Sequence, residues 1–90
     1  MTTLKLGRIV ATPGALETLS DANVGAATLL SRHASGDWGD ICKDDAKLND
    51  AAAKGEDRIL SAYDLPNGGK VWIITEWDRS ATTLLLPEEY

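Results

Sequence analysis

The segment that most constrains the fold of this chain is residues 71–77, Val-Trp-Ile-Ile-Thr-Glu-Trp. β-Branched and aromatic residues occupy nearly every position, which is typical of a strand. Residues 58–63 have the same character, and Asn67-Gly68 between the two segments is a strong hairpin signal. Residues 82–86 follow a polar turn. The last third of the chain is therefore predicted to be a three-stranded antiparallel meander with residues 71–77 in the middle.

The first half of the chain is predicted to supply a short strand and the helices. Residues 5–11 favour a strand that joins one edge of the sheet, and Thr12-Pro13 suits a helix start because proline lacks only an N–H that has no helical partner. Asn23 is a candidate cap for a second helix over 24–34, and residues 42–55 favour a third. The chain is expected to be one α+β domain, 1–90, whose sheet packs on two to three helices.

The turn at Asn67-Gly68 also predicts a register. A two-residue turn would pair Tyr63 with Trp72 and Ser61 with Ile74. Two faces follow from this pairing: a core face with Leu60, Ala62, Val71, Ile73 and Thr75, and a half-exposed face with Ile59, Ser61, Tyr63, Trp72, Ile74 and Glu76. A slip of one residue would exchange the faces of one strand.

Composition excludes several classes of protein. The net charge of −5 argues against a protein that coats DNA or RNA, because such a protein needs a basic surface to displace counterions. No apolar run approaches the length of a membrane span, about 18 residues, and the N-terminus lacks the apolar core of a signal peptide. The single cysteine, Cys42, suits a reducing compartment. A cytoplasmic protein without a membrane segment is expected.

His33 is the one histidine and the obvious candidate for proton transfer near neutral pH. A helix that carries histidine above a sheet that carries Arg58 and Glu76 is an arrangement similar to small metal-independent ribonucleases of the barnase and RelE type. The alternative is that His33 only completes a helix terminus. One histidine and one cysteine cannot build an ordinary zinc site, and no cofactor motif is present, so neither a metal nor a cofactor is expected.

Acidic and aromatic residues form a candidate partner-binding surface. Trp38 lies between two glycines and has two interpretations, an anchor that fills the core or an exposed contact for a partner. The acidic residues cluster around the third helix and would suit a basic protein surface. The candidate partner-binding residues are Asp37, Trp38, Asp40, Asp44, Asp45, Tyr63, Trp72 and Trp77.

The chain resembles a family of small proteins carried on plasmids and integrated elements and called plasmid-related. The resemblance covers nearly the whole chain and lies in residues 7–15, Arg32-His33, residues 36–39, 58–63 and 72–76, Asp78-Arg79-Ser80, Thr82-Thr83 and residues 87–90. Trp77 departs from the family's pattern, which has a small residue at that position. The resemblance implies a mobile-element context, and it implies no catalytic residues.

These observations lead to three hypotheses. The first is a non-enzymatic interaction protein of a mobile element that binds a host or element protein with a basic surface, of the anti-restriction or anti-CRISPR type that the resemblance implies. The second is a small ribonuclease-like toxin, or an inactive relative, that uses His33, Arg58 and Glu76. The third is a homodimer whose aromatic sheet face is the subunit interface. Direct binding of nucleic acid is not expected because the chain is acidic.

Overall fold

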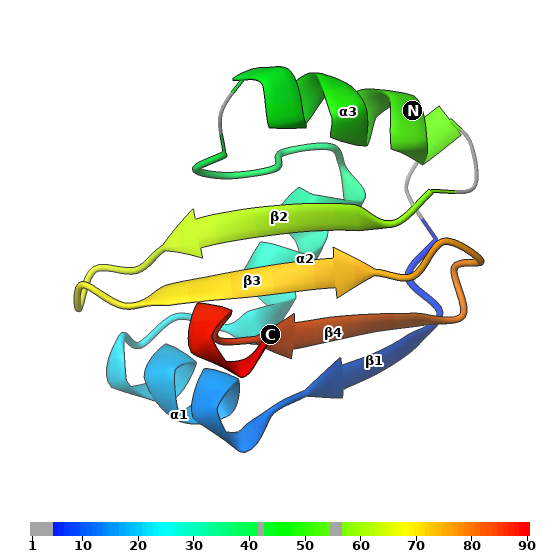
Figure 1. Cartoon of the computed structure of the whole chain (residues 1–90). Coiled ribbons are helices and arrows are strands. Elements are labelled where there is room, and N and C mark those ends of the chain that lie inside the picture. The colour runs from blue at the N-terminus through cyan, green and yellow to red at the C-terminus, as the bar shows by residue number, and fades with distance from the viewer. Residues whose placement is uncertain (1–4, 42, 55–56) are drawn as a thin grey trace.

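The computed structural model confirms an α+β architecture with three α-helices, a four-stranded mixed sheet and a short 3₁₀ helix (Figure 1). It describes residues 5–41, 43–54 and 57–90, except the side chains of 43–45 and 52–54. The elements are β1 (Arg8–Ala11), α1 (Pro13–Asp21), α2 (Ala26–Ala34), α3 (Lys43–Lys54), β2 (Ile59–Asp64), β3 (Lys70–Thr75), β4 (Ala81–Leu85) and η1 (Pro87–Glu89).

The strands lie in the order β1-β4-β3-β2. The pairs β2–β3 and β3–β4 are antiparallel, so the predicted meander is confirmed. The N-terminal strand joins the sheet beside β4 and runs parallel to it. The long connection from β1 to β2 carries all three α-helices, which is why the first and last thirds of the chain meet in one sheet.

The main core lies between one face of the sheet and the helices α1 and α2. In Figure 1, α2 crosses behind the strands and α1 lies at the lower left. Leu19 of α1 and Leu29 of α2 pack against Val71, Ile73 and Leu84 of the sheet. Burial of each such side chain contributes about 1.5–3 kcal/mol. Unlike α1 and α2, the helix α3 lies along the outer edge of β2, so the three helices do not form one layer (Figure 1).

The start of α1 follows the prediction, whereas the start of α2 does not. The Thr12 hydroxyl caps α1 by accepting a hydrogen bond from the Ala15 N–H at 3.1 Å, with Pro13 in the first turn. Asn23, the predicted cap of α2, instead ends α1 in the left-handed conformation with φ of 57°. Its short polar side chain tolerates that conformation, as is common just after a helix end. The helix α2 begins at Ala26, after Gly25.

The predicted register of the β2–β3 hairpin is wrong by one residue. Tyr63 pairs with Val71, and Trp72 pairs with Ala62. The Gly68 N–H donates to the Leu65 carbonyl at 3.0 Å, so the turn begins at Leu65 and includes Pro66. Pro66 sets the backbone at the second turn position, and Gly68, at φ of 84°, takes the left-handed position that follows. This longer turn shifts β2 by one residue and exchanges its two faces.

Candidate functional site

A chain of polar side chains crosses the core from α2 to the N-terminal segment. His33, in the last turn of α2, has no solvent-accessible surface. Its Nδ1 atom lies 2.5 Å from the Ser61 hydroxyl and its Nε2 atom lies 2.7 Å from the Thr75 hydroxyl. The Thr75 hydroxyl is in turn 2.9 Å from the hydroxyl of Thr82, which donates to the Leu6 carbonyl at 2.7 Å.

The Leu6 carbonyl at the end of this series of hydrogen bonds determines which atom is the donor in each of them. A carbonyl only accepts, so Thr82 uses its one hydroxyl proton on Leu6. Thr75 must then donate to Thr82, and His33 must donate to Thr75 from Nε2. The Nδ1 atom is left as the acceptor for Ser61. The neutral Nε2–H tautomer of His33 therefore satisfies all of these groups.

Burial, and to a smaller extent the positive charge of Arg79, together lower the pKa of His33 to about 4. The imidazole is consequently neutral near pH 7 and faces no solvent. Arg58 lies on the other face of the sheet, above the Tyr90 ring at 5.3 Å. Glu76 is in the turn that follows β3. The structure therefore does not bring His33, Arg58 and Glu76 together as a catalytic group.

Stability should decrease as the pH falls below 6.5. The unfolded chain binds a proton on His33 near its ordinary pKa of 6.5, whereas the folded chain resists protonation down to about pH 4. The contribution is complete above pH 6.5 and is lost progressively toward pH 4, to a total of about 3 kcal/mol. Urea unfolding at pH 7 and pH 5 measures it. The variant His33→Gln should lose less stability over this interval, and an equal loss would contradict the assignment to His33.

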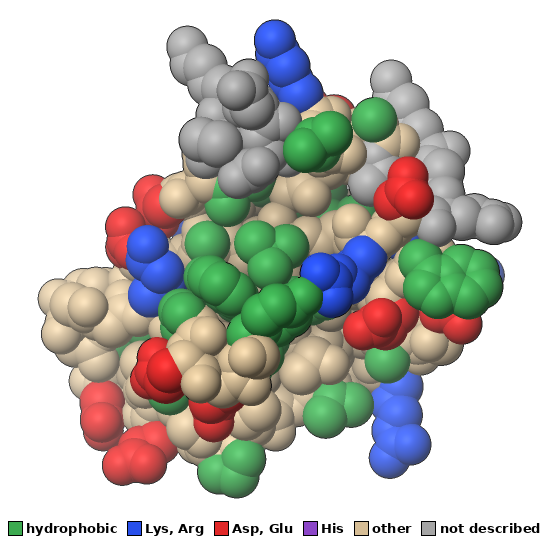
Figure 2. All heavy atoms as spheres, in the orientation of Figure 1, with side chains coloured by type: hydrophobic (Ala, Val, Ile, Leu, Met, Phe, Trp, Pro, Cys, Tyr) green, Lys and Arg blue, Asp and Glu red, His purple; other side chains and the backbone are tan. Residues whose placement is uncertain are grey.

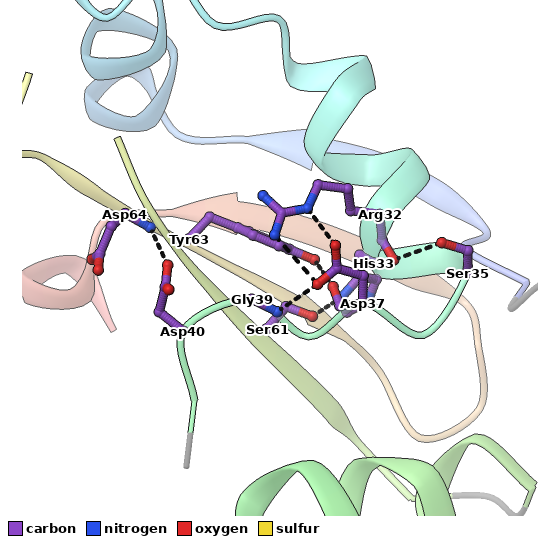
Figure 3. A network of polar contacts seen from close by, with 9 residues as sticks. All are labelled: Arg32, His33, Ser35, Asp37, Gly39, Asp40, Ser61, Tyr63 and Asp64. Carbon is purple, nitrogen blue, oxygen red and sulfur yellow. Dashed lines mark hydrogen bonds and ion pairs between the residues drawn. The ribbon is translucent and has the colours of Figure 1, made fainter. Parts of the chain in front are cut away.

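The loop after α2 is tied to both α2 and β2 (Figure 3). The Arg32 guanidinium donates to the Asp37 carboxylate at 2.6 Å and holds the pKa of Asp37 below its ordinary value. The Tyr63 hydroxyl donates to the Asp37 carbonyl at 2.6 Å, and the Asp40 carboxylate accepts from the Asp64 N–H at 2.8 Å. Asp37 and Asp40 are exposed, as a docking surface requires, but both also hold the loop in place.

Two of the predicted partner-binding aromatics are buried. Trp38 is 6% exposed, packs against Ile59 and donates from its indole N–H to the Asp50 carboxylate at 2.9 Å. Tyr63 has no exposed surface, because the register shift turns it toward the helices. Neither ring can reach a partner in this conformation, so Trp38 is the core anchor and the prediction of contact residues is wrong at both positions.

We call the face of the sheet that is turned away from α1 and α2 the open face. Its members come from β2, β3 and β4, and they are Leu60, Ala62, Trp72, Ile74, Thr83 and Leu85. Trp72, Leu60 and Thr83 are half-buried, whereas Ala62, Ile74 and Leu85 are buried. Figure 2 shows hydrophobic side chains gathered in the middle of this face, with basic side chains to either side.

Tyr90 and α3 border the open face. The Tyr90 ring packs edge-on against Trp72 at 5.7 Å and carries Arg58 above it. A groove lies between α3 and β2, lined by Leu48, Asn49, Arg58 and Leu60. Leu48 is 69% exposed, a large apolar side chain in contact with water beside the groove.

The remaining predicted contact residues are Trp77, Asp44 and Asp45. Trp77 is 57% exposed, in the turn between β3 and β4. The backbone of Asp44 and Asp45 belongs to α3, but their side chains lie outside the described residues, so the predicted acidic surface at these positions stays a prediction. Sequence reasoning missed Leu48, Leu60 and Tyr90. The signal that could have identified Leu60 is Pro66, which lengthens the turn and reverses the faces of β2.

Comparison with protein-family models, with curated proteins and with solved structures finds no match for this chain. The described residues contain no group of three or more His, Cys, Asp or Glu side chains placed to hold a metal ion. No helix in the described ranges has both the length and the apolar character needed to cross a membrane.

Proposed function

We propose that this chain is a protein-binding module that presents the open face and the adjoining groove to a partner protein. The observation that carries the proposal is an apolar sheet face, turned away from α1 and α2, on which Trp72 and Leu60 stay partly exposed. The helices α1 and α2 both pack on the core face. Within the described part of the chain, η1 lies in front of the sheet (Figure 1), and Tyr90 packs against Trp72. Trp72 and Leu60 therefore remain in contact with water.

The residues on this surface are of the types that dominate binding energies. Trp, Tyr and Arg are enriched among the residues whose truncation weakens an interface most. Tyr90 contacts Trp72 edge-on and lies beneath the Arg58 guanidinium, and exposed Leu48 supplies an apolar contact at the border. The net charge of −5 favours approach by a partner with a basic surface.

The resemblance to plasmid-related proteins suggests where such a partner would be found. Small acidic accessories of mobile elements serve their element by occupying a host defence protein, so we propose an inhibitor of a restriction or CRISPR component that acts by binding. This part of the proposal rests on the resemblance, whereas the choice of surface rests on the open face.

The test is capture from a host lysate with the wild-type chain and two matched variants, followed by mass spectrometry and titration of the captured protein. Leu48→Asp places a charge beside the groove and should weaken binding by about tenfold or more. Leu16→Asp is the control, because Leu16 is also an exposed helix leucine, at 51%, and belongs to α1, which packs on the core face of the sheet. Equal binding by both variants would remove the groove from the proposal.

A further inference from the structure

The two edge strands of the sheet, β2 and β1, differ in the hydrogen bonding of their outward-pointing backbone groups. At the β2 edge, the Leu60 N–H donates to the Asn49 side-chain oxygen at 3.3 Å, and the Leu60 carbonyl accepts from the Asn49 amide at 2.6 Å. The Ala62 N–H and carbonyl are bonded to the backbone of the 38–40 loop. The Asp64 N–H is bonded to Asp40. Each residue of β2 whose backbone groups point away from β3 thus makes a hydrogen bond at this edge.

The β1 edge has no such cover within the described residues. The N–H groups of Arg8 and Thr12 point inward, because they donate to the carbonyls of Ser80 and Leu84 at 3.0 Å each. Backbone groups alternate along a strand, so the N–H and carbonyl groups of Ile9 and Ala11 point outward. No described residue bonds to them.

The side chains of β1 are also unusual for an edge exposed to water. Ile9 is 46% exposed and Val10 is 43% exposed, and they lie on opposite faces of the strand. Natural edge strands are normally protected by charged residues, by proline or by a covering segment, because an uncovered strand pairs with other strands. Among the described residues, a covering segment protects β2, whereas at β1 only the short length of the strand and the charge of Arg8 limit pairing.

We propose that β1 is an interface at which two copies of this chain pair antiparallel across a twofold axis. The two four-stranded sheets would then join into one continuous sheet. An antiparallel pairing of identical strands satisfies twofold symmetry by construction, since each residue i opposite j implies j opposite i. The interface is distinct from the open face and leaves it uncovered.

Backbone geometry selects one register for this pair. If Ile9 faces Ala11 of the partner subunit, the outward groups of both residues are bonded in each chain, and Val10 faces Val10 of the partner subunit. If Ile9 faced Ile9 instead, Ala11 would need Gly7 as its partner. Gly7 is at φ of 64°, which is not a strand conformation, and a Cβ there would meet the Arg79 carbonyl. The register centred on Val10 is therefore favoured.

Charges at the ends of β1 fit the same register. Arg8 would lie opposite Thr12 of the partner subunit. Thr12 donates to Oε1 of Glu89 at 2.6 Å, and Leu86 N–H donates to the same oxygen at 2.8 Å. The Oε2 atom of Glu89 accepts no hydrogen bond from a described residue, and Arg8 makes no ion pair with one. The twofold axis would form this Arg8–Glu89 contact twice.

Sedimentation equilibrium over a wide range of concentration tests the proposal. A short interface of this kind is expected to give a dimer with a micromolar or weaker dissociation constant. Ile9→Pro removes an N–H that has no partner among the described residues, so it should abolish dimerisation while the monomer stays folded. Ile9→Val, the control, should dimerise like the wild type. A wild type that stays monomeric throughout, or an Ile9→Pro variant that dimerises equally well, would overturn the proposal.

The charge contact tests the register separately. Arg8→Glu should weaken the dimer about tenfold, because two attractive contacts become repulsive. Adding Glu89→Gln should recover most of the loss, since glutamine keeps the oxygen that accepts from Thr12 and removes the like charge. A double variant as weak as Arg8→Glu alone would rule out this register. Loss of the dimer without loss of partner capture would leave the proposed function unaffected.

Discussion

Replacing His33 with alanine should lower the free energy of unfolding by about 3–5 kcal/mol. The substitution empties the volume of a fully buried ring and also removes the hydrogen-bond partner of two buried hydroxyls, Ser61 and Thr75. The cost of the cavity and the cost of the unsatisfied polar groups add to one another. Urea unfolding at pH 7, followed by circular dichroism, measures the loss.

The variant His33→Gln separates the contribution of the hydrogen bonds to stability from that of the side-chain volume. A glutamine side chain can offer both a donor and an acceptor, so we expect it to lose roughly half as much stability as alanine. If alanine lost less than about 0.5 kcal/mol, the polar chain from Ser61 to Leu6 would contribute nothing to the fold.

Replacing Trp38 with alanine should cost about 3–5 kcal/mol. Trp38 and Ile59 form the centre of a second core beneath α3, with Ile41 and Ala46 packed around them. The variant also loses the bond from the indole N–H to Asp50, which joins the loop to α3. We therefore expect α3 to lose its attachment to the sheet first, which amide exchange of its backbone would show.

Trp77 provides the matched control. It is the same residue type and is 57% exposed, so Trp77→Ala should change the stability by no more than about 0.5 kcal/mol. Equal losses in the two variants would contradict the assignment of Trp38 as the anchor.

The order of the elements could be predicted from the sequence because each element has its own local signal. Thr12-Pro13 marks the start of α1, and the β-branched run over 71–77 marks the central strand. The α+β class and the antiparallel meander follow from such signals. The parallel pairing of β1 with β4 depends on contacts between residues more than 70 positions apart, and no local pattern encodes it.

The faces of the sheet were harder to predict, because they depend on turn length. Asn67-Gly68 by itself favours a two-residue turn, and only Pro66 reveals the longer one. The error of one residue moved Tyr63 to the surface and Leu60 to the core. Val71, Ile73 and Thr75 were assigned correctly to the helix side, since the pattern of β3 does not depend on the turn.

The candidate site was predictable only in part for the same reason. Trp72 was correctly placed among exposed-face residues, whereas Leu48 and Tyr90 belong to segments whose position is set by tertiary packing. The anchor interpretation of Trp38 followed from size alone, because so small a domain has few large side chains with which to fill a core.

The polar chain through His33 has a consequence for folding specificity. If β2 slipped by one residue, Ser61 would turn to the other face, and Nδ1 of His33 would be buried without a donor. A comparable slip of β4 would remove Thr82 from Thr75. Apolar side chains tolerate such misalignment more readily than a set of hydroxyls that each have one proton to give. The buried imidazole thereby selects against misaligned strands, in a sheet whose turn sequence alone permits more than one alignment.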